Sequence, residues 1–138
     1  MDNNLRREII LENYNNPKNR GLVKDKTYKF VNTNNSSCID NIDIMVKIEE
    51  NKIKDIVFDG EACAITTSAT SIMIKSLLDK SIKEVKDIII NYEKMINEEE
   101  YDDKILGELN VYDEVYKQPN RKKCALLPIE AIKKVINM

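Results

Sequence analysis

Residues 42–58 read IDIMVKIEENKIKDIVF, and the pattern of this segment predicts a pair of β-strands. Its first half places aliphatic side chains at every second position, which is the period of a β-strand with one buried face. Residues 49–52 are polar and predict a hairpin turn, after which residues 53–58 return as the partner strand. Tyr28 and Phe30 begin a further strand earlier in the chain. The sequence therefore predicts a small antiparallel sheet of about three strands.

Helical patterns flank this sheet on both sides. Residues 2–14 carry apolar side chains at helical spacing and should end before Pro17, because a residue that precedes proline avoids helical geometry. A second helix is predicted through residues 69–77. A third begins at residues 81–84, SIKE, which have the pattern of a capping box. Strands followed by helices predict an α+β fold with the helices packed on one face of the sheet.

The last helix contains apolar residues near the end of the sequence and a proline at position 128. Proline has no amide hydrogen and is tolerated in the first turn of a helix, so we expect this helix to begin close to Cys124. Neither a linker nor an internal repeat is visible. Residues 1–138 are therefore expected to form a single domain.

Composition excludes several classes of function. The formal net charge of −2 lacks the basic excess of an electrostatic nucleic-acid binder. Apolar runs are too short to cross a bilayer, and no secretory signal is visible, so the expected location is the cytoplasm. The chain contains no His, which removes the Ser-His-Asp and Cys-His arrangements and every His metal ligand. Any chemistry must use thiols, carboxylates, lysines or a metal.

The chain has three cysteines, Cys38, Cys63 and Cys124. An odd number without signs of export argues against a disulfide framework, although three unrelated buried cysteines remain an alternative. Cys38 lies in a polar loop, and Cys63 lies between a strand and a helix. Cys124 follows residues 121–123, RKK, near the expected helix start. Helix N-termini and nearby cations favour the thiolate, which is the form that binds metal or attacks sulfur.

Asp40 lies two residues after Cys38. Three thiolates leave a tetrahedral zinc ion one ligand short, and Asp40 could supply an oxygen from the same loop. A plain loop-capping role for Asp40 is an equally fair interpretation. The spacing is a weak signal, because the Cys-x-x-Cys pairs of structural zinc sites are absent.

Four motifs in this sequence resemble those of the SufU/IscU/NifU N-terminal group of iron–sulfur cluster assembly proteins. Residues 14–21, YNNPKNRG, resemble Y-x-x-P-x-N-x-G, and residues 37–40, SCID, resemble a C-G-D motif. Residues 58–71, FDGEACAITTSATS, resemble F-x-G-x-G-C-x-I…S-A-S, and residues 121–128, RKKCALLP, resemble the segment of the third cysteine. The motifs occur in the family's order and include all three cysteines.

Two features are similar to the SufU branch of this group. Lys123 replaces the His that precedes the third cysteine in the scaffold branch, and the span from Cys63 to Cys124 is long, as expected of the SufU insertion. The acidic residues 98–113 are expected in or near that insertion, with residues 98–103 on a solvated surface. Ile39 and Ala62 stand where the family has glycine, so we expect the backbone of the loops beside the ligands to be less permissive than usual.

The resemblance implies an IscU/NifU-N-like fold and a zinc ion bound by Cys38, Asp40, Cys63 and Cys124. It also implies a sulfurtransferase role, in which Cys38 receives persulfide sulfur from a SufS-like cysteine desulfurase and leaves zinc to do so. The sulfur would pass on to downstream iron–sulfur scaffold proteins. Arg121 would orient Asp40 or steer sulfur. An equal alternative is that Arg121 is a solvated surface residue with no role in the site.

Two other functions use the same residues. A scaffold would assemble an iron–sulfur cluster, or bind iron, on these four ligands, and ligand type alone cannot separate it from the zinc protein. A non-catalytic, zinc-stabilised interaction module would use the metal only to hold its fold.

Overall fold

The computed structural model describes residues 1–33 and 40–138. The elements in chain order are helix α1 (Asn3–Asn15), strands β1 (Lys29–Asn32), β2 (Asn41–Glu49) and β3 (Lys52–Glu61), helices α2 (Ala64–Leu77) and α3 (Ile82–Ile96), the short 3₁₀ helices η1 (Asp103–Ile105), η2 (Gly107–Tyr112) and η3 (Val115–Lys117), and helix α4 (Pro119–Val135). None of the helices within the described ranges is long and apolar enough to cross a membrane.

The predicted sheet is present. Its strands are antiparallel in the order β1-β2-β3, with Val31 opposite Ile44 and Ile44 opposite Phe58. Glu50 and Asn51 connect β2 to β3 with positive φ angles of 49° and 63°, the conformation that two-residue hairpin turns require. The sequence prediction of the hairpin at residues 49–52 is confirmed.

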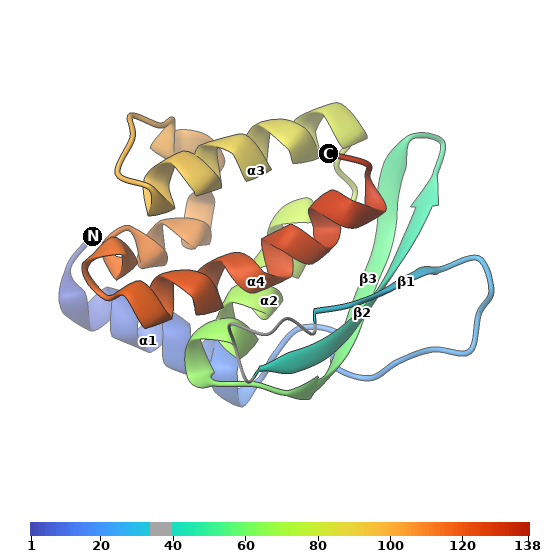
Figure 1. The fold of residues 1–138 in the computed structure, drawn as a ribbon, viewed down its shortest axis with the longest axis horizontal. Coiled ribbons are helices and arrows are strands. Elements are labelled where there is room, and N and C mark those ends of the chain that lie inside the picture. Colours follow the sequence, from blue (N-terminus) through green and yellow to red (C-terminus); the bar gives the residue numbers. More distant parts are fainter. Residues whose placement is uncertain (34–39) are drawn as a thin grey trace.

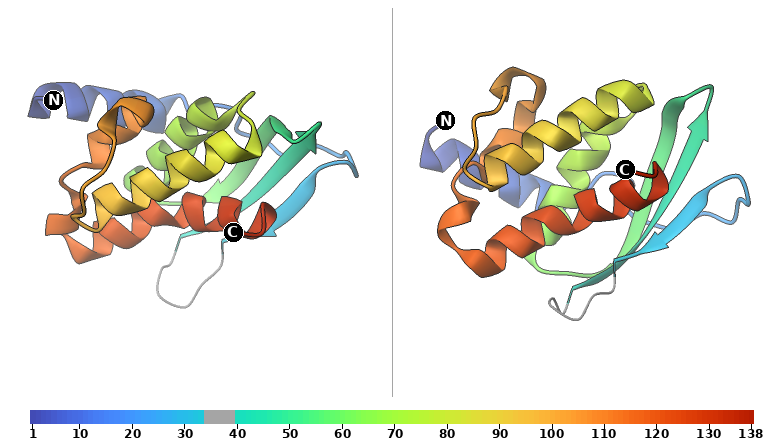
Figure 2. Two further views of the ribbon diagram at one scale, coloured as in Figure 1. Left: turned by 90° about the horizontal axis from the view of Figure 1, so that it is seen from above. Right: turned by 45° about the horizontal axis from the view of Figure 1, so that its top comes forward.

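One face of the sheet is buried beneath helices. The alternating residues Ile42, Ile44 and Val46 are at most 1% exposed, and they join the side chains of α2, α3 and α4 in one apolar cluster. Figures 1 and 2 show these helices on one side of the sheet, with the opposite side uncovered by any of them. Lys47, on the other face of β2, is partly exposed. The predicted α+β fold is confirmed.

Residues 17–21 fasten the end of α1 to β3 and α2. The Gly21 amide donates to the Phe58 carbonyl at 2.7 Å, and the Phe58 amide donates to the Asn19 carbonyl at 3.2 Å. The Lys18 amide donates to the Ser71 hydroxyl at 2.8 Å. The first of the four motifs therefore has a structural role, because its polar backbone groups pair with a strand and a helix far along the chain.

Helix α4 differs from its prediction. It begins at Pro119, and Pro128 lies inside it, so the expected start near Cys124 is wrong. Pro119 occupies the first turn, where a missing amide hydrogen costs nothing. Pro128 leaves the carbonyl four residues earlier, that of Cys124, without its usual partner in the helix. The Thr66 hydroxyl lies 3.2 Å from this carbonyl, which gives it a partner from another helix.

The segment between α3 and α4 contributes to the core. Residues 98–100 are exposed, as expected of the acidic stretch, but Leu106, Leu109 and Tyr112 are buried. The Tyr112 hydroxyl lies 2.5 Å from the Ser68 hydroxyl of α2, and burial raises the pKa of this tyrosine well above its ordinary value. Short 3₁₀ turns lack the period of an α-helix, so no pattern in the sequence predicts this packing.

Gly60 lies in β3 at a position with no room for a side chain. Its φ is +133°, and a Cβ there would lie 2.4 Å from the Asn41 carbonyl oxygen of β2. We expect Gly60→Ala to lower the free energy of unfolding by at least about 1–3 kcal/mol, because strain at this φ adds to the clash. Urea denaturation measures the loss. Gly21→Ala is the matched control, since its φ is +122° with no atom within 4 Å of the added Cβ. Equal losses in both variants would show that the close approach to Asn41 contributes nothing.

Candidate metal centre

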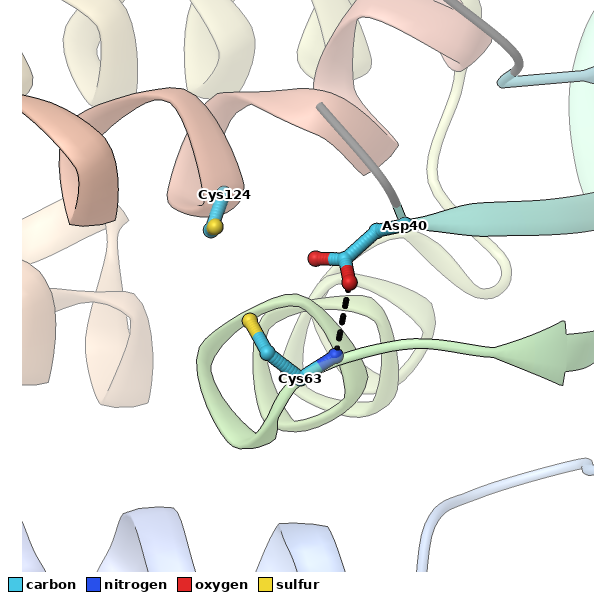
Figure 3. A group of neighbouring side chains, drawn as sticks. All are labelled: Asp40, Cys63 and Cys124. Carbon is cyan, nitrogen blue, oxygen red and sulfur yellow. Dashed lines mark hydrogen bonds between the residues drawn. The ribbon is translucent and has the colours of Figure 1, made fainter. Parts of the chain in front are cut away.

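Asp40, Cys63 and Cys124 converge at one end of the buried face, from three different elements (Figure 3). Asp40 immediately precedes β2, Cys63 lies between β3 and α2, and Cys124 lies in α4. One carboxylate oxygen and the two sulfur atoms all lie within 4.8 Å of one another. Cys38, the fourth expected ligand, lies outside the described residues.

Cys63 is the N-cap of α2. Its backbone is extended, with φ −67° and ψ 169°, and its sulfur accepts a hydrogen bond from the Thr66 amide at 3.4 Å. The helix begins at Ala64, close to the predicted place. The first amides of a helix have no partner within the helix, so the Thr66 amide is available to bond to this sulfur. The side chain is also exposed, which leaves it accessible to an ion or a partner.

Asp40 is held in place by hydrogen bonds to the start of α2. It is only 5% exposed, and its Oδ1 accepts from the Cys63 amide at 2.9 Å (Figure 3). Its Oδ2 accepts from the Thr66 hydroxyl at 2.6 Å. A carboxylate oxygen has lone pairs for more than one partner, so these bonds orient the group and leave room for a metal ion. The loop-capping role and the ligand role are therefore compatible.

Cys124 projects from α4 toward Cys63 and Asp40, as Figure 3 shows. It follows Pro119 by five residues, so it lies inside the helix, and the expected help from a helix N-terminus does not apply to it. The side chain is half-buried. Its charged neighbours in sequence, Arg121 and Lys123, are exposed on the same helix.

Arg121 lies beside the site without reaching Asp40. It lines a surface cavity of about 540 Å³ together with Arg7 of α1 and with Ala64 and Ile65 of α2, the two residues that follow Cys63. In the part of the chain that the structure describes, Arg121 forms no hydrogen bond or ion pair with Asp40. Its expected role near the metal stays a prediction.

The donor set fits a metal ion such as zinc. Two sulfur ligands of one tetrahedral zinc ion lie about 3.8 Å apart, because each Zn–S bond is ~2.3 Å long. The donor atoms here lie within 4.8 Å of one another, so side-chain movements on the order of 1 Å would bring all three to one ion. Thiolates are soft ligands that suit zinc and iron–sulfur clusters alike. Three ligands from the described residues leave a position for a fourth.

The structure adds to the sequence analysis of the site at two residues, Ala62 and Thr66. Ala62, which stands where the family has glycine, does not have a positive φ, so alanine causes no backbone strain there. Ile39 lies outside the described residues. Thr66, fully buried at the third position of α2, was missed. Its spacing from Cys63 is the available signal, because the third residue of a helix lies back against the N-cap.

This chain is similar in sequence and structure to known proteins over most of its length. The family model described as NifU-like N terminal domain matches residues 5–137. The zinc-dependent sulfurtransferase SufU of Bacillus subtilis is 34% identical over 131 residues, covering 94% of this chain and 88% of the relative. The iron–sulfur cluster assembly scaffold protein IscU of Thermotoga maritima is 30% identical, covering 94% and 90%. A crystal structure of a Fervidobacterium islandicum protein assigned to the SUF system superposes with a TM-score of 0.85, at 28% identity and 94% coverage of both chains.

Proposed function

The chain belongs to the NifU-like N-terminal domain family of iron–sulfur cluster assembly proteins, and we propose that within it the protein is a zinc-dependent acceptor of persulfide sulfur from a cysteine desulfurase. The observation that carries the proposal is the convergence of Asp40, Cys63 and Cys124 within 4.8 Å. Cys38, two residues before Asp40 in the chain, would complete a four-ligand site. Zinc bound there would stabilise the thiolate forms of its cysteine ligands at neutral pH.

The proposed reaction is a thiol–persulfide exchange at Cys38. The Cys38 thiolate attacks the outer sulfur of the persulfide on the desulfurase. The sulfur–sulfur bond of the donor breaks, the donor cysteine leaves as a thiolate, and Cys38 becomes the persulfide. No oxidant or reductant is consumed, because the outer sulfur only changes its partner. Asp40, Cys63 and Cys124 would keep the metal during this exchange.

Two observations support sulfur transfer over the scaffold. The relative that is 34% identical is named a zinc-dependent sulfurtransferase. Lys123 occupies the place of the His that precedes the third cysteine in the scaffold branch, so this chain lacks one ligand available to a scaffold. The sulfur would then pass to downstream scaffold proteins of the same assembly machinery.

A scaffold function is the second candidate. The relative from Thermotoga maritima is named an iron–sulfur cluster assembly scaffold protein, and its identity of 30% is close to that of the sulfurtransferase. The described donor set of two sulfurs and one oxygen suits a cluster as well as zinc. Ligand chemistry alone therefore does not decide between the two.

Metal analysis of the protein purified without added metal separates these candidates. We expect one zinc per chain, no acid-labile sulfide and no visible absorption. Iron with matching labile sulfide and visible absorption bands would favour the scaffold and overturn the sulfur-transfer proposal. The Cys63→Ala variant is the control, because metal bound at this site should fall with loss of the ligand, whereas adventitious metal should not.

A further inference from the structure

Thr66 contacts all three residues of the described metal centre. Its hydroxyl oxygen lies 2.6 Å from Asp40 Oδ2, 3.2 Å from the Cys124 carbonyl oxygen and 3.5 Å from the Cys63 sulfur. Its amide also donates to that sulfur at 3.4 Å. The side chain is 0% exposed, so water does not compete for these contacts. One hydroxyl thus joins a loop, a helix start and a helix interior.

The contact with Cys124 depends on a local irregularity of α4. In a regular helix, the amide of residue 128 would donate to the carbonyl of residue 124. Pro128 has no amide hydrogen, and its ring is crowded against that carbonyl, so the Cys124 carbonyl turns to a partner outside its own helix. The Thr66 hydroxyl is that partner. The position of Cys124 relative to α2 is therefore fixed by a side chain and not by packing alone.

The Thr66 hydroxyl has a single proton to share between two acceptors. Its distance to Asp40 is the shorter, 2.6 Å against 3.2 Å to the Cys124 carbonyl, so Asp40 is the better placed acceptor. Outer partners of this kind orient metal ligands, and losing one typically weakens metal binding about 10- to 100-fold. Without this hydroxyl, Oδ2 of Asp40 would lose the hydrogen bond that sets its direction, while Oδ1 would keep the Cys63 amide.

We infer that Thr66 is a positioning residue, whose hydroxyl holds Asp40 and the Cys124 segment at the separation that a metal ion needs. The inference rests on the proposed metal site and goes beyond it, because it states that a residue that is not a ligand raises the affinity of the site for its metal. Without the hydroxyl, Asp40 and α4 would keep their places in the fold but lose their mutual alignment.

The test compares zinc affinities, measured by competition with a chromophoric chelator, for wild type, Thr66→Val, Thr66→Ser and Thr66→Ala. Thr66→Val keeps the shape and removes the hydroxyl, and we expect zinc to bind about 10- to 100-fold more weakly. Thr66→Ser keeps the hydroxyl and should bind within a few-fold of wild type. The matched control is Thr70→Val, one turn further along α2. Thr70 is equally buried, and its hydroxyl donates to the Thr66 carbonyl of the same helix.

The Ser and Ala variants keep the inference testable if the valine variant folds poorly. Both lose the same methyl group, so the difference in zinc affinity between them reports the hydroxyl alone. Equal affinities for the Ser and Ala variants, with wild type binding zinc, would overturn the role of Thr66 and leave the proposed function standing. Failure of wild type itself to bind zinc would overturn both. A weaker Ala variant, with unchanged Thr70→Val, would support the inference.

Discussion

The Cys124→Ala variant is expected to lose stoichiometric zinc binding while keeping its fold. Cys124 lies in the interior of α4, where alanine is the best helix former, so the substitution removes a ligand without removing a cap. The loss of affinity should exceed the roughly 10- to 100-fold effect of losing an outer partner. At a zinc concentration that is ~100 times the dissociation constant of wild type, zinc should stabilise wild type by about 2.7 kcal/mol and leave the variant unchanged.

Thermal unfolding with and without added zinc measures this difference. Lys123→Ala is the control, because it truncates the exposed neighbouring side chain and keeps all ligands. The control should show the full rise in melting temperature with zinc. A Cys124→Ala protein that still gained stability from zinc at the wild-type concentration would place the metal elsewhere and refute the assigned site.

The second large effect is expected for Cys38→Ala, which should no longer accept sulfur from a cysteine desulfurase. The proposed reaction needs the Cys38 thiolate, and an alanine provides no nucleophile. Mass spectrometry after incubation with a desulfurase and free cysteine should show one added sulfur atom on wild type and none on the variant. Desulfurase turnover, followed as alanine production, should lose its stimulation by the same substitution.

The folding of this variant distinguishes sulfur transfer from a zinc-stabilised interaction module. Sulfur transfer requires Cys38 to leave the metal, so Asp40, Cys63 and Cys124 must hold the fold without it, and Cys38→Ala should unfold cooperatively near the wild-type temperature. The module would instead unfold when Cys38 is lost, and sulfur would never reach even the wild-type chain. Persulfide found on another cysteine of wild type would contradict the assignment of Cys38 as the acceptor.

The sheet and most helices follow from local patterns in the sequence. Alternation across residues 42–48 fixes which face of β2 is buried, because a shift of one residue would expose every aliphatic side chain. The capping box at Ser81 and Glu84 forms as predicted, with both reciprocal hydrogen bonds present. These features depend on residues close together in the chain, which is why the sequence alone reveals them.

The errors arise where tertiary contacts override local rules. By local rules, Pro128 predicts a helix start near Cys124. In the structure α4 continues through this proline, and the Thr66 hydroxyl of α2 bonds to the Cys124 carbonyl in place of the amide that proline lacks. The burial of residues in η2 was not predicted in either direction, because it depends on packing against α1, α2 and α3 and follows no helical period. The error and the omission both involve partners that are distant in sequence.

Residue types and positions in the sequence indicate Asp40, Cys63 and Cys124 as candidates but not their geometry, and the role of Cys38 stays a prediction. Cys63 and Asp40 could be named from residue type and position, and the position of Cys63 before a helix also followed from the pattern. That Asp40, Cys63 and Cys124 meet could not be derived, because their convergence depends on how α4 packs against α2. Thr66 escaped notice for the same reason, since its acceptors lie 26 and 58 residues away.

Pro128 also has a consequence for attempts to engineer this protein for heat resistance. A proline inside a helix costs about 3 kcal/mol relative to alanine, so Pro128→Ala would rank high among substitutions chosen for thermostability. The new amide would bond to the Cys124 carbonyl within α4 and compete there with the Thr66 hydroxyl. A more heat-resistant chain would then bind its metal less well, because the irregularity that weakens the helix serves the site.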